Sequence, residues 1–471
     1  MSLDSINLSK MTLIKSISGI RGTIGGSPGD NLTPIDAVQF AAAYGTWLKS
    51  VSDTDRLKVV VGRDARLSGE MIATLVIQTL VGLGIEVIDL GLSTTPTVEM
   101  AVPYHKASGG LILTASHNPK QWNALKLLNS KGEFISGAEG ELLLKIATDG
   151  SFVFAEVDEL GKVSTDSEAI ERHIEAICKL SDVDIPAIKN ANFKVVIDAV
   201  NSTGGISVPQ LLRKLGVTDV VEMYCDPTGH FPHNPEPLKE HLTELSSRVV
   251  SEGAHLGITV DPDVDRLALV NEDGSMFGEE YTLVAVSEDI LSKRKGATVS
   301  NLSSTRALRD ITEEVGCTYH ASAVGEVNVV VKMKETNAVI GGEGNGGIIY
   351  PELHYGRDSL VGIALFLSHL AHKKMSMTAL RASYPNYEMA KKKIDLTPGI
   401  DVDAILEKMA KRYENEEVDT VDGVKIYIGK EWVHLRKSNT EPIIRVYTES
   451  KDATAASDLA DRIIEEIKGL I

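Results

Sequence analysis

The sequence predicts an α/β fold with three similar α/β domains, each on a mixed sheet, followed by a C-terminal α+β domain. Strand-like apolar runs alternate with helix-like segments over most of the chain, which is typical of βαβ units around a buried sheet. The pattern starts again near residues 193 and 297, and it changes character after about residue 386. At 471 residues the chain is also too long for a single hydrophobic core.

The first domain is expected to span residues 11–160. The first ten residues have little pattern and are interpreted as a disordered leader. After them, a strand, a helix and two more strands are expected at LKVVV (57–61), at the helix-like stretch 69–82, at IEVIDL (85–90) and at GLILT (110–114).

The second and third domains, expected at 161–272 and 273–385, repeat this order. In the second, strands are expected within FKVVIDAVNSTGG (193–205) and at HLGITV (255–260). In the third, they are expected within ATVSNLSST (297–305) and NAVIGGEGNGG (337–347). The three starts are compatible with a diverged internal repeat.

The last domain, expected at 386–471, has a different order. A helix-like run at 401–413 precedes three short strand-like runs, VKIYIG, WVHLR and IIRVYTE, and a terminal helix is expected from Ala453. Strands that follow one another with short connections favour an antiparallel sheet and an α+β domain.

Composition excludes several classes of function. The formal net charge of −18 argues against a nucleic-acid surface, and no apolar stretch is long enough for a membrane span. The three cysteines, Cys178, Cys225 and Cys317, are far apart, which favours reduced thiols in a cytoplasmic protein over disulfides or a metal site. Because the chain is negatively charged as a whole, binding of an anionic substrate would require arginine and lysine side chains gathered at the binding site.

A polar cluster, TASHNP (114–119), follows the strand-like run that ends at residue 114. Ligand sites in open α/β folds collect outside such strand ends. Ser116 is therefore a candidate nucleophile, with His117 and Lys126 as candidate groups for proton transfer. A plain polar turn at Asn118 and Pro119 is the alternative, and a serine hydrolase is disfavoured because no G-x-S-x-G motif surrounds Ser116.

A second loop, DPDVDR (261–266), also follows a strand. In an extended chain, alternate residues share one face, so Asp261, Asp263 and Asp265 could bind one hard cation such as magnesium, manganese or calcium. A calcium-binding EF-hand is disfavoured because its sixth position requires glycine and here is Arg266, and because LALV (267–270) reads as another strand.

Magnesium held by carboxylates usually needs phosphate oxygen to complete its coordination. A phosphoryl group on Ser116 would supply that ligand, and the cation would act as a Lewis acid on phosphoryl transfer.

Two further loops carry side chains suited to a sugar phosphate. In GGEGNGG (341–347), glycines allow close approach of a ligand, and Glu343 and Asn345 suit sugar hydroxyls, although a tight hairpin is the simpler interpretation. The loop RKSNTEPIIR (436–445) combines donors that match a phosphate, or forms a polar turn: Arg436, Ser438, Asn439, Thr440 and Arg445.

Taken together, six motifs in order make the chain resemble the α-D-phosphohexomutases from about Ile14 to the C-terminus. The motifs are SGIRG (18–22), GRDARLSG (62–69), TASHNP (114–119), DPDVDR (261–266), GGEGNGG (341–347) and RKSNTEP (436–442). The resemblance implies four domains around a central cleft, and movement of a phosphoryl group between the 6-hydroxyl and the 1-hydroxyl of a hexose through a hexose 1,6-bisphosphate.

The resemblance also assigns roles to residues. Ser116 matches the family's phosphoserine, and Asp261, Asp263 and Asp265 match its Mg²⁺ ligands, with the phosphate on Ser116 as a further ligand. Lys126 matches an acid/base lysine, Arg21 a neighbouring positive group, Glu343 a sugar-hydroxyl ligand and the 436–445 loop the site of the non-reacting phosphate. Arg266 would add positive charge.

The chain departs from many bacterial members in the sugar loop, where Asn345 replaces a serine and Gly347 a histidine, and near VGEVN, where Glu326 replaces a histidine found in some members. The preferred sugar is expected to be glucosamine phosphate, with phosphomannomutase/phosphoglucomutase activity as the alternative and a noncatalytic sugar-phosphate sensor as a remoter one. A monomer or a homodimer is expected.

Overall fold

The computed structural model describes residues 11–470 except 17–18, 55, 398 and 439–442, so the expected N-terminal leader lies outside the described residues. The chain divides into two compact units, Met1–Phe277 with Glu352–Ser376, and Gly278–Pro351 with Met377–Ile471. Among the described residues, no helix combines the length and apolar character needed to span a membrane.

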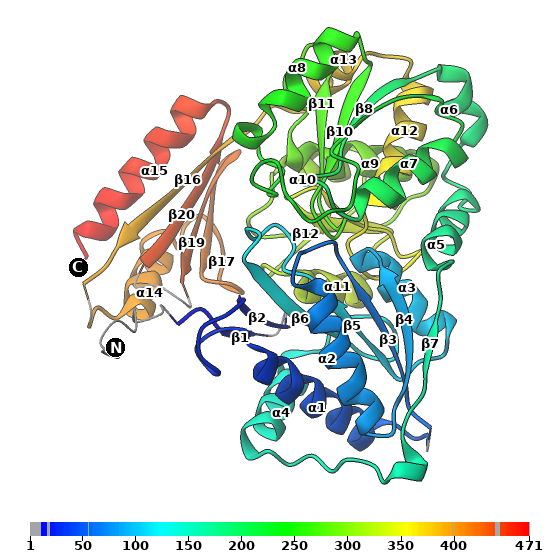
Figure 1. Cartoon of the computed structure of the whole chain (residues 1–471). Helices are drawn as coiled ribbons and strands as arrows, with labels where there is room; N and C mark the ends of the chain where they lie inside the picture. The colour runs from blue at the N-terminus through cyan, green and yellow to red at the C-terminus, as the bar shows by residue number, and fades with distance from the viewer. Residues whose placement is uncertain (1–10, 17–18, 55, 398, 439–442, 471) are drawn as a thin grey trace, which may run out of the picture. The chain divides into compact units, whose positions relative to one another are not determined.

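The first unit begins with a seven-stranded sheet in the order β1-β2-β6-β5-β3-β4-β7 (Figure 1). Its strands are β1 (Ile14–Ser16), β2 (Gly19–Thr23), β3 (Lys58–Arg63), β4 (Glu86–Leu92), β5 (Gly109–Leu113), β6 (Trp122–Leu128) and β7 (Val163–Thr165). Its helices are α1 (Pro34–Val51), α2 (Gly69–Gly82), α3 (Thr95–Tyr104) and α4 (Gly137–Asp149), with a short 3₁₀ turn η1 (Val157–Glu159).

Alternating side chains of β3 bury both faces of this sheet. Val59 and Val61 belong to the core that includes α1, α2 and α4, whereas Val60 belongs to the core that includes α3. A strand with apolar side chains on both faces needs helices on both sides, which is why KVVV reads as a continuous apolar run. The helix expected at 69–82 is present with those bounds.

A second sheet completes the first unit, in the order β11-β10-β8-β9. Its strands are β8 (Lys194–Asp198), β9 (Asp219–Met223), β10 (Leu256–Val260) and β11 (Leu267–Asn271). Its helices are α5 (Ala169–Cys178), α6 (Ile185–Ala191), α7 (Gly204–Lys214), α8 (Thr243–Glu252) and, from later in the chain, α12 (Ser359–Lys373), with a 3₁₀ turn η2 (Lys239–His241).

The second unit contains a four-stranded mixed sheet and a five-stranded antiparallel sheet. The mixed sheet has the strands β12 (Thr298–Asn301), β13 (Tyr319–Ser322), β14 (Ile340–Glu343) and β15 (Gly347–Ile349), with helices α9 (Glu279–Lys293), α10 (Ala307–Glu314) and α11 (Glu326–Thr336). The short helix α13 (Met377–Ala382) also belongs to this unit.

The antiparallel sheet has the order β16-β20-β19-β18-β17. It contains β16 (Glu388–Asp395), β17 (Glu417–Asp419), β18 (Val424–Ile428), β19 (Glu431–Lys437) and β20 (Ile443–Ser450), and the helices α14 (Val402–Arg412) and α15 (Ala453–Lys468). α15 packs along β20 and β16 (Figure 1). The predicted combination of three α/β domains with mixed sheets and a terminal α+β domain is confirmed.

One topology recurs in all three mixed sheets. Four successive strands lie in the spatial order second, first, third, fourth, with the first three parallel and the fourth antiparallel to the third: β4-β3-β5-β6, β9-β8-β10-β11 and β13-β12-β14-β15. The internal repeat suggested by the sequence is therefore present in the topology.

In each copy a hairpin connects the third strand to the fourth, although its length differs. It comprises residues 114–121 in the first sheet, 261–266 in the second and 344–346 in the third. These are the loops that carry Ser116, the three aspartates and Asn345. Because the hairpin leaves the carboxyl end of a parallel strand, each copy presents its polar loop at the edge where α/β folds bind ligands.

Candidate active site

Ser116 occupies an unusual backbone position in the first hairpin. Its φ is +49°, a left-handed conformation that is uncommon for a residue with a Cβ, and its side chain is largely buried. The Ser116 backbone N–H donates to Thr114 Oγ1 at 2.9 Å, and Thr114 Oγ1 donates to Asp64 Oδ2 at 2.6 Å. These bonds hold the serine in a conformation that the backbone alone would disfavour.

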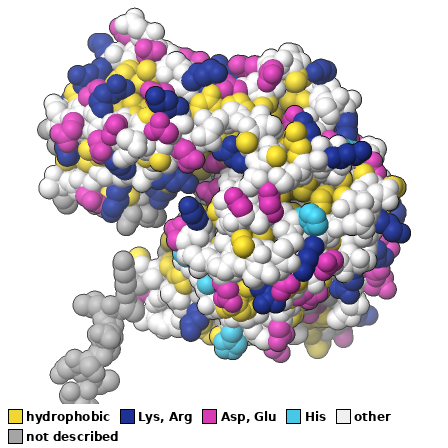
Figure 2. Space-filling model, turned by 90° about the horizontal axis from the view of Figure 1, so that it is seen from above, with side chains coloured by type: hydrophobic (Ala, Val, Ile, Leu, Met, Phe, Trp, Pro, Cys, Tyr) yellow, Lys and Arg dark blue, Asp and Glu magenta, His cyan; other side chains and the backbone are white. Residues whose placement is uncertain are grey.

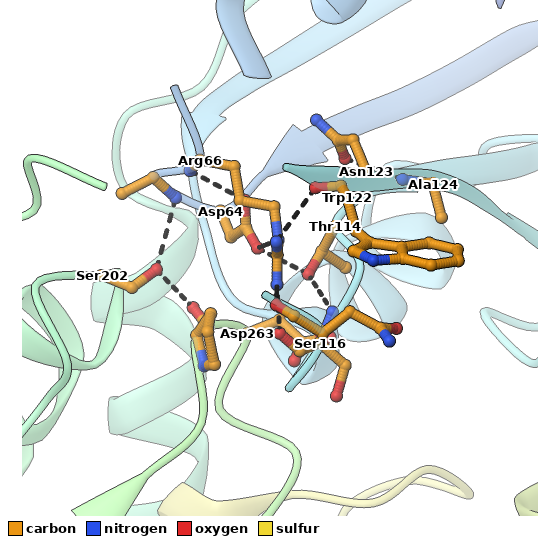
Figure 3. Close-up of polar contacts among 12 residues, drawn as sticks. Asp64, Arg66, Thr114, Ser116, Trp122, Asn123, Ala124, Ser202 and Asp263 are labelled. Atoms are coloured by element: carbon orange, nitrogen blue, oxygen red, sulfur yellow. Dashed lines mark hydrogen bonds and ion pairs between the residues drawn. The ribbon is translucent and has the colours of Figure 1, made fainter. Parts of the chain in front are cut away.

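A buried arginine fixes the rest of this loop (Figure 3). The Arg66 guanidinium donates to Asp64 Oδ2 and to four backbone carbonyls of the hairpin, those of Ser116, Asn118, Pro119 and Trp122. Sequence reasoning did not single out Arg66, although GRDARLSG (62–69) was recognised as a motif. Only arginine offers five donors in a rigid fork.

The second hairpin brings the three aspartates together at full burial. Val264 has a φ of +65°, which turns the chain sharply between Asp263 and Asp265. Asp261 Oδ1 accepts the backbone N–H groups of Asp265 and Arg266, both at 3.1 Å. The EF-hand alternative is excluded because β11 pairs with β10 from Leu267 onward, which leaves no room for a twelve-residue calcium loop.

The serine and the aspartates form one site. Ser116 Oγ donates to Asp261 Oδ2 at 2.6 Å, although 145 positions separate the two residues in sequence. Thr95, at the start of α3, binds the loop from the other side: its hydroxyl donates to Asp263 Oδ2 at 2.7 Å and its backbone N–H to Asp263 O at 2.8 Å.

The donor set fits a hard divalent cation. One ligand atom from each aspartate lies within 4.8 Å of the others. Asp263 Oδ1 and Asp265 Oδ1 are buried and have no hydrogen-bond partner among the described residues. Burial and the charges of Asp263 and Asp265 raise the pKa of Asp261, a repulsion that a bound cation would relieve. Carboxylate oxygens without a soft ligand suit magnesium, manganese or calcium.

Two cations partly neutralise this cluster. Lys126 Nζ lies 2.7 Å from Asp263 Oδ2 and 3.4 Å from Asp265 Oδ2, and Arg357 Nη2 lies 2.7 Å from Asp265 Oδ2. Burial alone would lower the pKa of Lys126, but the charges of Asp263 and Asp265 raise it above its ordinary value. Lys126 is therefore an ammonium ion in this arrangement. Arg357 was missed in the sequence, because its loop contains no pattern that distinguishes it from a surface turn.

His117 and Arg266 flank the serine. His117 Nδ1 lies 3.3 Å from Ser116 Oγ. Burial and the charge of Arg266 lower the pKa of His117 to about 3, so its imidazole is neutral at physiological pH. Arg266 pairs with Glu236 through Nη1 at 3.3 Å.

Arg21 lies on β2, in register with Ala124 of β6, and therefore on the same face of the sheet as Lys126. Its Nε is buried with no hydrogen-bond partner among the described residues, and burial lowers the pKa of its guanidinium. A guanidinium with a free Nε–H donor is suited to an anion.

The third hairpin is tight, as its glycine content indicated. Glu343 ends β14 and accepts from Asn301 Nδ2 at 2.8 Å and from the Gly325 N–H at 3.1 Å through the same oxygen, Oε1. Asn345 Oδ1 accepts the Gly347 N–H at 3.1 Å. The Asn345 carbonyl, expected from the sequence to accept from a sugar, is therefore already used within the loop.

The C-terminal loop is flanked by paired arginines. Arg436 of β19 and Arg445 of β20 are directly opposite in the antiparallel register. Arg436 lies 2.9 Å from Asp422 Oδ2, and the largely buried Ser438 donates its N–H to Ile443 O. Asn439 and Thr440 lie outside the described residues. Figure 2 shows acidic and basic side chains interspersed on one face of the molecule.

Family models match nearly the whole chain. They describe α/β/α domains I, II and III and the C-terminal domain of phosphoglucomutase/phosphomannomutase, and they match residues 13–153, 171–274, 278–387 and 386–466. The chain belongs to this family. It is thus a phosphohexomutase, an enzyme of the intramolecular phosphotransferase class, as its motifs implied.

Individual relatives agree with this membership. A phosphoglucomutase/phosphomannomutase of Thermococcus kodakarensis is 35% identical over 458 residues, which cover 95% of this chain and 99% of the relative. A probable phosphoglucosamine mutase of Methanopyrus kandleri is 31% identical over 454 residues, covering 96% and 97%. A crystal structure of a family protein from Burkholderia thailandensis superposes with a TM-score of 0.84 at 26% identity, covering 97% of this chain and 98% of that one.

Proposed function

We propose that the chain interconverts hexose 6-phosphate and hexose 1-phosphate through a phosphoryl group carried on Ser116. The observation that carries this proposal is the 2.6 Å hydrogen bond from Ser116 Oγ to Asp261 Oδ2, which joins a strand-end nucleophile to a buried, cation-ready carboxylate cluster. A polar turn without catalytic function would not require three fully buried aspartates.

The bound cation is proposed to be Mg²⁺, held by Asp261, Asp263 and Asp265 together with the phosphate on Ser116. When bound, it would supply Lewis-acid stabilisation of the charge on the transferred group. Full activity in excess chelator, or equal activity with calcium, would contradict this assignment, because calcium accepts looser geometry and concentrates its field less.

In the proposed first half of the reaction, the free hydroxyl of the substrate attacks phosphorus as the bond from phosphorus to Ser116 Oγ breaks. Neutral His117, 3.3 Å from Oγ, is placed to accept the hydroxyl proton and to pass it to Ser116 Oγ as that oxygen leaves phosphorus. Lys126 and Arg21 supply positive charge, and Arg66 keeps the loop from shifting. The sugar bisphosphate then turns around, and its other phosphate returns to Ser116.

The second unit is proposed to hold the sugar and its non-reacting phosphate. Glu343 and the side-chain NH₂ of Asn345 would bind sugar hydroxyls, and the phosphate would be bound by Arg436, Ser438, Asn439, Thr440 and Arg445.

The preferred substrate is proposed to be glucosamine phosphate. A 2-amino group favours nearby carboxylates, and the Gly325 N–H that binds Glu343 immediately precedes the largely buried Glu326. A relative named as a probable phosphoglucosamine mutase is consistent with this. The relative named phosphoglucomutase/phosphomannomutase supplies the alternative, a glucose or mannose phosphate.

The test compares Ser116→Ala with Ser130→Ala, an exposed serine in a turn after β6. Intact-mass analysis should find one phosphoryl group on the wild type and on Ser130→Ala, and none on Ser116→Ala, whose mutase turnover should fall by orders of magnitude. Normal turnover by a folded Ser116→Ala variant would overturn the proposal. Sugar-phosphate binding without turnover by the wild type would instead indicate a sensor.

A further inference from the structure

A cluster of buried ionisable residues lies outside the groups that the proposed reaction uses. It contains His173 of α5, Glu99 of α3, and His354 and Asp358 from the segment that precedes α12. Three of them, His173, Glu99 and Asp358, are at most 2% exposed. Burial of so many polar groups is costly unless they are paired, so the pairing pattern indicates their role.

Asp358 is the centre of the cluster. Its Oδ1 caps α12 by accepting the N–H groups of Leu360 and Val361 at 2.8 and 3.3 Å. Its Oδ2 lies 2.9 Å from His173 Nε2 and 3.4 Å from His354 Nε2. One carboxylate therefore joins a helix start to two imidazoles.

The other nitrogen of each imidazole contacts α3. His173 Nδ1 lies 2.9 Å from Thr97 Oγ1, and His354 Nδ1 lies 3.3 Å from Glu99 Oε2. Burial alone would lower the pKa of His354, but its hydrogen bonds to Asp358 and Glu99 and their charges raise it to about 10. His354 is therefore a cation between two buried carboxylates.

The backbone between His354 and Asp358 is also constrained. A Cβ added at Gly356 would lie 1.9 Å from Glu99 Oε2, so the loop backbone rests directly on that carboxylate. The next residue, Arg357, donates to Asp265 Oδ2, and the Ser359 N–H donates to Val264 O at 3.1 Å. The loop thus packs against α3 on one side and against the aspartate hairpin on the other.

These contacts form a closed path that includes two of the proposed metal ligands, Asp263 and Asp265. Thr95 binds Asp263 at the start of α3, and Arg357 binds Asp265. Starting from Asp263, the path runs through Thr95, Thr97, His173, Asp358, Arg357 and Asp265. Arg357 and Lys126 both contact the Oδ2 atom of Asp265. Its Oδ1 atom, which has no hydrogen-bond partner among the described residues, is therefore available to a cation.

We propose that His354, Glu99 and His173 are positioning residues that act through Arg357 to hold Asp265 in the orientation that binds the cation. The inference rests on the proposed metal site. None of the three residues touches the reacting atoms; each fixes the segment from which Arg357 reaches the aspartate cluster.

The test measures binding of Mn²⁺, an octahedral, oxygen-preferring ion that is visible by electron paramagnetic resonance. His354→Gln should weaken Mn²⁺ binding about tenfold, as loss of an outer-sphere partner commonly does, and should raise the Mg²⁺ concentration for half-maximal activity similarly. The KM for the hexose phosphate should stay unchanged. His372→Gln is the control, since it makes the same substitution at a more exposed pair, His372–Asp184 at 2.9 Å, near the end of α12.

A double-mutant cycle identifies the route of the effect. If His354 acts through Arg357, His354→Gln should weaken Mn²⁺ binding no further in the Arg357→Ala background. Equal losses in both backgrounds, or wild-type affinity in a folded His354→Gln protein, would overturn the inference. Glu99→Gln, which keeps the shape and removes the charge, serves as the second variant if His354→Gln does not fold.

Asp263→Asn separates the two proposals. If it leaves Mn²⁺ binding intact, the metal site itself is wrong. If it abolishes binding while His354→Gln and Glu99→Gln do not alter it, only the positioning role is wrong.

Discussion

Arg66 fixes the shape of the loop that carries Ser116. Five acceptors, four of them carbonyls of the Ser116 hairpin, converge on one guanidinium. The left-handed conformation of Ser116 is costly for a residue with a Cβ, so the loop needs contacts that determine its shape independently. Arg66 provides four of them, each to a different backbone carbonyl.

Arg66→Lys should therefore lower the free energy of unfolding by about 2–4 kcal/mol, because an ammonium has three donors and leaves at least two of the five acceptors unpaired. Urea denaturation measures this change. The control Arg248→Lys alters an exposed pair with Glu252 and should shift stability by less than about 0.5 kcal/mol. Similar shifts in both variants would contradict this role of Arg66.

His354 should make stability depend on pH at alkaline values. Its pKa rises from an ordinary 6.5 to about 10 in the folded protein, so folding favours the protonated form. The stabilisation is fully present below pH 6.5 and is lost as the pH rises toward 10. The groups that face it are Glu99 of α3, His173 of α5 and Asp358 at the start of α12.

The measurement is the difference in unfolding free energy between wild type and His354→Gln at pH 6, 8 and 10, values chosen to bracket the two pKa values. This difference should shrink steadily with rising pH. A difference that stays constant would mean that His354 is neutral in the folded protein.

At the scale of elements, the hairpin between the third and fourth strand of each mixed sheet carries a different part of the site. The strands were predictable because short apolar runs such as KVVV (58–61) favour a strand buried on both faces. The helix at 69–82 was predicted with its bounds. The polar clusters 114–119 and 261–266 were identifiable because each follows such a run. Their convergence follows from tertiary structure.

The segment before α12 shows what sequence reasoning cannot find. Arg357, His354 and Asp358 acquire their roles only from Asp265, Glu99 and His173, which lie at least 92 positions away in sequence. No local periodicity or motif in the sequence indicates such a pairing. The same holds for α12 itself, which follows the third mixed sheet in sequence but packs with the helices of the second.

The β19–β20 hairpin should bind whichever phosphate is not reacting. Arg436→Ala is expected to weaken binding of both the 1-phosphate and the 6-phosphate substrates by about 2–4 kcal/mol, the cost of losing a charged contact. Lys393→Ala is the control: Lys393 lies beside Arg445 in the same row of the sheet but is more than half exposed. Loss in only one reaction direction would contradict a shared phosphate site.

At the scale of the whole molecule, the phosphoryl-transfer residues belong to the first unit, whereas Glu343, Asn345 and the arginine hairpin belong to the second. The residues proposed for sugar preference and those proposed for phosphoryl transfer thus belong to different compact units. The preference should be read from kcat/KM for glucosamine 1-phosphate, mannose 1-phosphate and glucose 1-phosphate on one preparation, with glucosamine 1-phosphate highest. A higher value for either neutral sugar would reverse the substrate assignment and leave the Ser116 mechanism unaffected.

The threefold recurrence of one topology has a consequence for how such an enzyme can evolve. Each of the three hairpins joins strands of the same sheet order but differs in length and in the side chains that it carries, so one scaffold holds three different loops. If the 344–346 turn contacts the sugar as proposed, a substitution there changes a loop of a different sheet from those that carry Ser116 and the three aspartates. Under this proposal, the preferred sugar could change while the residues that transfer the phosphoryl group stay the same.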